Sequence, residues 1–261
     1  MSGCLAAIYS INLQYFRRLE VFSGGTCRFL SRKSMSWWEL PRIPEDEVMA
    51  EPEKVSAYAS AAAQAYLNSL DETFVQQVLE SGVSSGLALD IGTGPGRIPL
   101  RIARENPRLK VFGVDRSKAM VRAAKSAAQE WNLGTQVQFF LGDANCLCFP
   151  DAVFDLVFTN SLIHHLENPI LAFREMTRVT RPGGWVMVRD IRRPSRFSFP
   201  LAVALHGRHY KGFMRQLYVA SLRSAYTYDE FRELLNCASL GATYLFLFRR
   251  THLGFVMQKG G

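Results

Sequence analysis

The stretch Leu87-Ala-Leu-Asp-Ile-Gly-Thr-Gly-Pro-Gly-Arg-Ile, residues 87–98, decides the fold. An apolar run of strand length contains Asp90 near its end, and three glycines then turn the chain into an amphipathic stretch. Glycine adopts positive φ without strain and lets a ligand approach the backbone closely. The pattern therefore predicts a strand, a ligand-binding turn and a helix. A tight turn that holds no ligand is the alternative interpretation.

Outward from this turn, apolar runs of strand length alternate with amphipathic runs of helix length. The strands are expected at 87–91, 110–115, 136–141, 154–159 and 185–190, with helices at 98–105, 118–131 and 169–179. This rhythm predicts an α/β fold with a doubly wound, mostly parallel sheet that is covered on both faces. A helix over 229–237 is expected to precede strands at 243–248 and 252–258, whose short connection requires an antiparallel pair.

Acidic residues stand at the ends of three expected strands: Asp90, Asp115 and Asp143. Parallel strands bring their C-terminal ends to one edge, where ligands bind in the crevice of an open α/β sheet. Each aspartate alone fits a helix N-cap equally well. A dinucleotide site is the competing ligand class, but its G-x-G-x-x-G/A pattern needs a small residue where this chain has Arg97.

Five motifs carry a resemblance to a known family. They are LDIGTGPG (89–96), VFGVD (111–115), GDA (142–144), FPDAVFDLVFTNSLIHH (149–165) and RPGG (181–184). Residues of about 87 to 191 thereby resemble the class I S-adenosylmethionine-dependent methyltransferase domain, in particular its UbiE-like (type 11) branch. The resemblance implies a Rossmann-like methyltransferase fold of seven strands with an antiparallel terminal strand, and S-adenosylmethionine as cofactor.

The resemblance also implies roles for seven cofactor-binding positions. The three glycines would pack against the methionine part of the cofactor, and Asp90 would orient the loop or the ammonium group. Asp115 would hold the ribose, and Asp143 the adenine amino group with Ala144 beside the ring. The seven positions are Asp90, Gly92, Gly94, Gly96, Asp115, Asp143 and Ala144.

Methyl transfer from a sulfonium requires alignment of the acceptor and exclusion of water, and a base only where the acceptor must lose a proton. The catalytic candidates are Asn160, His164 and His165, which follow the fourth expected strand at the cofactor edge. Helix entry and hydrogen bonding are the structural alternative for the paired histidines. The segment Thr159-Asn-Ser-Leu contains no Asn/Asp-Pro-Pro-Tyr, which argues against adenine-N6 or glutamine methylation.

The long connection 192–226 is expected to cover the substrate. It is rich in aromatic, histidine and basic residues, and Tyr210, Arg223 and Tyr226 are the substrate-binding candidates. One interpretation is a pocket for an anionic or aromatic acceptor, and the other is a helical cap with a solvated basic face. The favoured function is methyl transfer to a small molecule. The alternatives are an RNA methyltransferase that uses the basic-aromatic patch 189–223, and a catalytically inactive cofactor-binding protein.

The distribution of charge and the sequence pattern suggest three regions: a leader, a lead-in and a domain. The net charge of +8 is concentrated in residues 1–34, with five basic residues and one acid, and in 189–223, with eight basic residues and one acid. Residues 1–34 are interpreted as a leader, either a transit peptide or a start-site artefact that precedes Met35 and is not part of the native domain. Residues 35–86 are expected to be a helical lead-in with helices at 55–67 and 71–80, and residues 87–261 the methyltransferase domain.

Cysteine usage and hydropathy complete the expectations. The five cysteines include no C-x-x-C and no matching His cluster, so neither a disulfide framework nor a metal site is expected, and a cytoplasmic setting fits. A soft-metal site at Cys146 and Cys148 is the alternative. No apolar run has the length of a transmembrane helix.

Overall fold

The computed structural model describes residues 16–22, 37–45, 65–210, 212–240 and 243–260. The helices are α3 (Ala65–Leu79), α4 (Arg97–Glu105), α5 (Lys118–Glu130), α6 (Pro169–Val179), α7 (Ser198–Leu205), α8 (Phe213–Ser224) and α9 (Tyr228–Ala238), with 3₁₀ turns η2 (Ile163–His165) and η3 (Gly207–His209). The strands are β1 (Phe16–Phe22), β2 (Ser85–Ile91), β3 (Arg108–Asp115), β4 (Val137–Leu141), β5 (Phe154–Asn160), β6 (Thr180–Ile191), β7 (Thr243–Phe248) and β8 (His252–Gln258).

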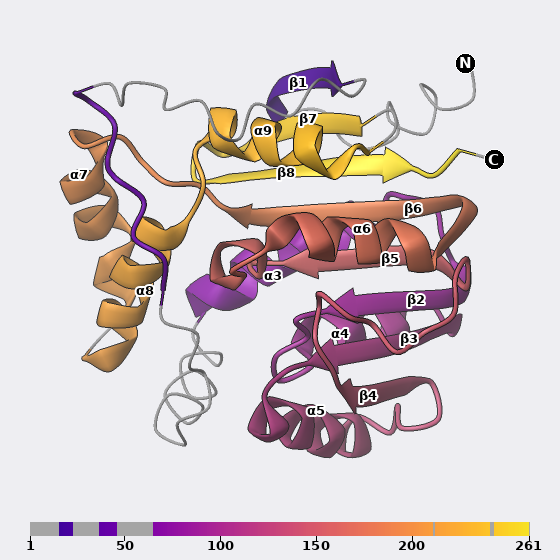
Figure 1. The fold of residues 1–261 in the computed structure, drawn as a ribbon. Helices are drawn as coiled ribbons and strands as arrows, with labels where there is room; N and C mark the ends of the chain where they lie inside the picture. Colours follow the sequence, from indigo (N-terminus) through magenta and orange to yellow (C-terminus); the bar gives the residue numbers. More distant parts are fainter. Residues whose placement is uncertain (1–15, 23–36, 46–64, 211, 241–242, 261) are drawn as a thin grey trace.

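The strands form one sheet in the order β1-β7-β8-β6-β5-β2-β3-β4 (Figure 1). Strands β2 to β6 are parallel to their neighbours in this group, whereas β8 is antiparallel to β6 and β7 is antiparallel to β8. These seven strands confirm the predicted doubly wound, mostly parallel sheet with a reversed end. The expected strands at 243–248 and 252–258 are β7 and β8.

Strand β1 is an eighth strand that the sequence analysis did not anticipate. It lies in the leader and pairs antiparallel with β7, from Phe16 opposite Phe248 to Phe22 opposite Thr243. A part of the leader therefore extends the sheet at its outer edge. Whether the domain folds and functions without residues 1–34 stays a prediction.

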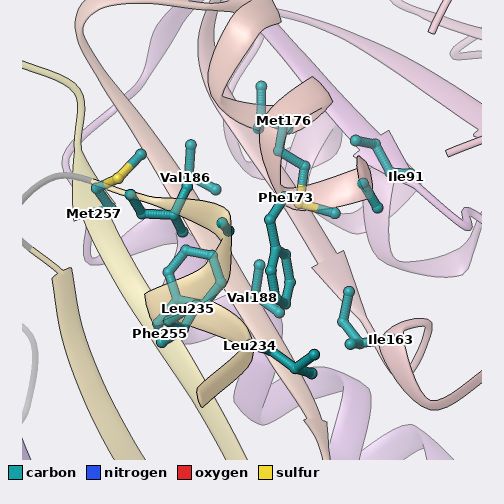
Figure 2. Packing of buried hydrophobic residues seen from close by; sticks show 14 of the residues in the cluster. Ile91, Ile163, Phe173, Met176, Val186, Val188, Leu234, Leu235, Phe255 and Met257 are labelled. Atoms are coloured by element: carbon teal, nitrogen blue, oxygen red, sulfur yellow. The ribbon is translucent and has the colours of Figure 1, made fainter. Parts of the chain in front are cut away.

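Two apolar layers hold the helices on the two faces of the sheet. On one face, α6 and α9 pack on alternate residues of the central strands, as Phe173, Leu235, Val188 and Phe255 show in Figure 2. On the other face, α3, α4 and α5 pack on the remaining strand residues, with Phe74 against Phe158. Burial on both faces explains why the central strands read as continuous apolar runs rather than alternating ones.

The segment 192–226 forms a helical cover at one end of the sheet. Figure 1 shows the arrowheads of β2, β5 and β6 pointing toward α7 and α8. Residues 37–45 run beside these two helices, where Ile43 N donates to Arg223 O at 3.1 Å and Arg196 N donates to Trp38 O at 2.9 Å. The cover therefore consists of α7, α8 and the lead-in segment 37–45, and it faces the C-terminal ends of the parallel strands.

The 181–184 segment, the lead-in helices and the cysteines differ in part from the sequence expectations. The residues 181–184 form a bulge inside β6 rather than a separate turn, because Thr180 pairs with Phe154 and Trp185 with Leu156. The helix expected over 71–80 is part of α3, and the helix expected over 55–67 falls largely outside the described residues. Cys146 and Cys148 are free and exposed, whereas Cys237 is disulfide-bonded, which the sequence analysis did not expect.

Within the described ranges, none of the helices combines the length and apolar character needed to span a bilayer.

Candidate active site

A cavity of about 380 Å³ opens at the C-terminal ends of β2, β3, β4 and β5. We call it the cofactor cavity. It is lined by seven of the candidates from the sequence: Gly92, Gly94, Asp115, Asp143, Ala144, Asn160 and His165. The fold therefore brings together residues from four separate strand ends, as the motif positions predict.

Asp115 joins two of these strand ends. Its Oδ2 accepts a hydrogen bond from Gly94 N at 2.8 Å, and its Oδ1 accepts one from Ser117 N at 2.8 Å. Burial raises the pKa of Asp115, and the backbone N–H groups of Ser117 and Gly94 oppose this shift. A carboxylate has about four acceptor sites, so each oxygen retains a lone pair for a ligand hydroxyl. These two acceptor oxygens suit a ribose whose two free hydroxyls donate hydrogen bonds.

The glycine turn is shaped by steric contacts on both of its sides. Gly92 has φ +73°, and an added Cβ would lie 2.8 Å from Leu162 Cδ1. Gly96 has φ +81°, and its Cβ would lie 2.7 Å from the ring of Phe139. Gly92 lines the cavity, whereas Gly96 packs against the sheet below it. The turn must therefore be glycine at both positions, for backbone and packing reasons.

Asp90 lies beneath the turn and does not line the cofactor cavity. It is 2% exposed and accepts a hydrogen bond from Thr93 Oγ1 at 2.8 Å. Burial raises the pKa of Asp90 to about 7, although the hydrogen bond from Thr93 opposes the shift. Of the two roles that the sequence suggests, this geometry favours orientation of the loop.

Asp143 and Ala144 lie on the far side of the cavity. Asp143 Oδ1 accepts a hydrogen bond from Asn145 N at 2.8 Å, which fixes the carboxylate in the turn after β4. Ala144 is 8% exposed and packs in the apolar core beside it. An acceptor carboxylate next to a small apolar side chain fits an amino-substituted aromatic ring.

A second cavity, of about 450 Å³, lies between the sheet edge and the cover. We call it the acceptor cavity. Its walls come from η2, the end of β6, α7, α8 and the β7–β8 turn, and Ser161 and His165 line both cavities. A molecule in the acceptor cavity would therefore lie beside one in the cofactor cavity.

The paired histidines stand at this boundary and have different partners. His164 Nδ1 lies 2.6 Å from Asp190 Oδ1, and His164 N donates to Asp190 Oδ2 at 2.9 Å. His165 Nδ1 lies 2.9 Å from Glu45 Oε2. Burial lowers the pKa of His165, and the neighbouring His164 lowers it further. Burial alone would raise the pKa of Glu45, but its hydrogen bond with His165 and the charges of both histidines bring it below its usual value.

Asn160 is held from behind by a buried arginine. Arg189 Nε donates to Asn160 Oδ1 at 2.9 Å, and the same guanidinium donates to Thr73 Oγ1 at 2.9 Å and Leu70 O at 2.8 Å. Arg189 is 0% exposed, and burial lowers its pKa to about 9. The side-chain amide of Asn160 is thereby fixed at the wall of the cofactor cavity.

The structure separates the three substrate candidates. Tyr210 lines the acceptor cavity, with its ring centroid 5.1 Å from that of Tyr218. Tyr226 instead belongs to the apolar core, with Arg42 Cζ 4.2 Å from its ring centroid. Arg223 lines a different, shallow groove and lies over the ring of Phe199 at 5.2 Å. Of these three residues, Tyr210 is the one that lines the acceptor cavity.

Glu45, Asp190 and Arg189 are site residues that sequence reasoning missed. Asp190 and Arg189 end the fifth parallel strand, and that position at the ligand edge could have identified them. They were counted only as surface charge. Glu45 lies in an acidic, proline-punctuated stretch with no motif, and only the folded chain brings it to His165.

Comparison with known proteins identifies a methyltransferase domain within the chain. Residues 89–188 match the family model described as "Methyltransferase domain". The chain is 36% identical over 107 residues to an uncharacterized methyltransferase of Schizosaccharomyces pombe, covering 39% of this chain and 38% of that protein. It is 38% identical over 111 residues to a demethylmenaquinone methyltransferase of Roseiflexus castenholzii, covering 42% and 45%. The chain thus matches less than half the length of these curated relatives.

The fold extends the likeness beyond the matched residues. A putative S-adenosyl-L-methionine-dependent methyltransferase from Methanococcus maripaludis superposes with a TM-score of 0.65, at 18% identity, covering 84% of this chain and 98% of that one. All five motifs lie within the matched residues 89–188, and the sheet formed by β2 to β8 agrees with the fold of this neighbour. Residues 89–188 are therefore a methyltransferase domain of the class I S-adenosylmethionine-dependent kind, whose cofactor is S-adenosylmethionine.

Proposed function

We propose that this protein transfers a methyl group from S-adenosylmethionine to a small-molecule acceptor held in the acceptor cavity. The observation that carries the proposal is the junction of the two cavities at Ser161 and His165. When bound, the cofactor supplies an activated methyl group, so the protein's task is to align the acceptor and exclude water.

Different residues of the cofactor cavity bind different parts of the cofactor in this proposal. Asp115 accepts hydrogen bonds from the ribose hydroxyls, and Asp143 accepts one from the adenine amino group beside Ala144. Gly92 and Gly94 let the methionine part approach the backbone. Asn160, fixed by Arg189, orients the same part of the ligand at the end of β5.

At the acceptor side, His165 is the titratable residue that contacts both cavities. His164, held by Asp190, forms the adjacent wall of the acceptor cavity. The cover lines the acceptor cavity with apolar side chains of α7 and α8, including Leu201, Leu205 and Leu217. A partly apolar acceptor fits these walls, and Arg192 and Arg250 add positive charge that suits an anionic group.

The placement of the basic residues favours a small molecule over RNA. Two of the eight basic residues in 189–223, Arg189 and Arg193, are 0% and 4% exposed. Arg193 is paired with Glu230, and Arg223 lies over the ring of Phe199. These side chains do not line one groove along which a phosphate backbone would run.

A labelling experiment tests the proposal. The protein is incubated with methyl-labelled S-adenosylmethionine and a cell extract, with or without ribonuclease, and the products are separated by size. Label in the small-molecule fraction, unaffected by ribonuclease, is the expected result. Label in a nuclease-sensitive macromolecular fraction would instead support the RNA alternative.

A further inference from the structure

Three side chains of metal-ligating type meet where the acceptor cavity borders the cofactor cavity. Glu45, His164 and His165 each offer one ligand atom, and these atoms all lie within 4.8 Å of one another. All three residues line the acceptor cavity. They come from the lead-in segment and from η2, so the cluster forms only when the lead-in packs against the domain.

His164 has the arrangement of a histidine that is prepared for a metal ion. Its Nδ1 lies 2.6 Å from Asp190 Oδ1, and both side chains are 3% exposed. With Asp190 ionised, Nδ1 carries the proton and Nε2 keeps its lone pair. His164 Nε2 is buried and has no hydrogen-bond partner among the described residues. Metal-bound histidines almost always donate their other ring N–H to a carboxylate or carbonyl in this way.

His165 and Glu45 supply the other two ligands. His165 Nδ1 and Glu45 Oε2 are 2.9 Å apart, and the ring centroids of the two histidines are 3.9 Å apart. Zinc binds histidine nitrogen and carboxylate oxygen at about 2.0–2.2 Å, which places neighbouring ligand atoms about 3.3 Å apart in a tetrahedron. The three ligand atoms already lie within 4.8 Å of one another, and an ion among them would replace the proton between His165 and Glu45.

We propose that Glu45, His164 and His165 bind one divalent transition-metal ion of the Zn²⁺ class, with Asp190 as the carboxylate that orients His164. Two nitrogens and one carboxylate suit zinc and its first-row neighbours, and three protein ligands leave a coordination position open. Because all three ligands line the acceptor cavity, the open position faces that cavity. This site was not expected from the sequence, where the histidines were considered without Glu45.

The consequence for chemistry rests on the proposed function, although metal binding itself does not. An acceptor hydroxyl bound at the open position ionises more readily and releases its proton to solvent. The oxygen then forms the new bond to the methyl carbon while the carbon–sulfur bond breaks and its electron pair stays on sulfur. The metal thus points to an oxygen acceptor.

Metal titration of the full chain tests the site without any acceptor. Chelator-treated protein is titrated with Zn²⁺ by calorimetry and with Co²⁺ by visible absorption. We expect one ion per chain, with the intense absorption bands of a four-coordinate cobalt site. Glu45→Gln and His165→Gln should each weaken binding at least about tenfold, and Asp190→Asn about 10- to 100-fold.

Two controls make the titration specific. His206→Gln removes another histidine of the same cavity and should leave the metal affinity unchanged. The double variant Cys146→Ser, Cys148→Ser removes the two exposed free thiols and should also leave it unchanged. Thermal unfolding identifies any variant that has lost its fold, and Glu45→Gln, whose side chain lies at the cavity wall, then carries the comparison.

The results that overturn the proposal are distinct from those that overturn the proposed function. Absence of stoichiometric Zn²⁺ or Co²⁺ binding by the wild-type chain contradicts the site, as does wild-type affinity in both Glu45→Gln and His165→Gln. Binding of S-adenosylhomocysteine is measured separately on the same samples. Its failure with metal binding intact would contradict the proposed function and leave the metal site standing.

Discussion

The carboxylate of Asp115 accepts a hydrogen bond from the backbone N–H of Gly94 at 2.8 Å, which ties the end of β3 to the glycine turn after β2. One side chain thereby fixes the turn and faces the cofactor cavity. The shape of the turn and the position of this carboxylate are coupled. A ligand that contacts Asp115 therefore also stabilises the turn.

The buried Asp90 should make stability depend on pH. Its pKa is raised to about 7 in the folded chain, against about 3.9 when unfolded. The folded state then binds more protons between these values, so the free energy of unfolding falls as pH rises from about 4 to about 7. Asp90→Asn should flatten this part of the profile and raise stability at pH 8, by an amount on the order of 2–4 kcal/mol. Urea unfolding at several pH values measures the effect, and an identical slope in both proteins would contradict it.

Tyr210 should affect the acceptor and not the cofactor. Because it lines only the acceptor cavity, Tyr210→Ala should reduce kcat/KM for the acceptor at least about tenfold, as expected for lost apolar contact of roughly 1.5–3 kcal/mol. Affinity for S-adenosylhomocysteine should stay within about twofold. Arg223→Gln is the matched control, because Arg223 lines a different groove, and it should keep normal turnover. Equal loss of acceptor turnover and cofactor affinity in Tyr210→Ala would indicate a structural role.

Tyr226 should affect stability instead of specificity. Its ring is 8% exposed in the core under Arg42. Truncation to alanine should lower the free energy of unfolding by about 3–5 kcal/mol, whereas Tyr226→Phe keeps the packed ring and should retain turnover. Chemical denaturation compares the variants. A Tyr226→Ala protein of wild-type stability with altered acceptor preference would contradict this assignment.

Residues 1–34 should be dispensable for cofactor binding. A shortened chain beginning at Met35 should bind S-adenosylhomocysteine with unchanged affinity, because β1 pairs with β7 at the opposite side of the sheet from β2, β3 and β4. Loss of β1 exposes the edge of β7, and exposed edges promote association. Light scattering should therefore show more aggregation while the titration is unchanged. Loss of cofactor binding in the soluble fraction would show that the leader belongs to the functional domain.

The local motifs predicted much of the fold and of the cofactor cavity. Asp115 and Gly94 could be placed because parallel strands bring their ends to one edge, whatever the details of packing. Strand β1 could not be placed, because its charged sequence, with Arg17, Arg18 and Glu20, lacks the pattern of a buried strand. An edge strand needs no such pattern.

The acceptor side was harder to predict because burial is a property of the folded chain. Arg189 was counted as surface charge, yet it is fully buried beneath Asn160. Glu45 reaches His165 only through the packing of the lead-in segment on α8, which no periodicity encodes. Tyr226 was chosen for its residue type and position in the cover, and its ring turned out to belong to the core.

The central claim is that the crevice at Asp115 binds S-adenosylmethionine. Calorimetric titration with S-adenosylhomocysteine and with NAD tests this claim on the wild-type chain and on Asp115→Ala. Asp229→Asn is the control, because it removes the charge of an exposed aspartate that does not line the cofactor cavity. Charged hydrogen bonds are worth about 1.5–3 kcal/mol each, so Asp115→Ala should bind S-adenosylhomocysteine at least roughly tenfold more weakly. The wild-type and control proteins should bind it equally, and NAD should give no heat of binding. Tight NAD binding without a response to S-adenosylhomocysteine, or unchanged affinity in Asp115→Ala, would contradict the account.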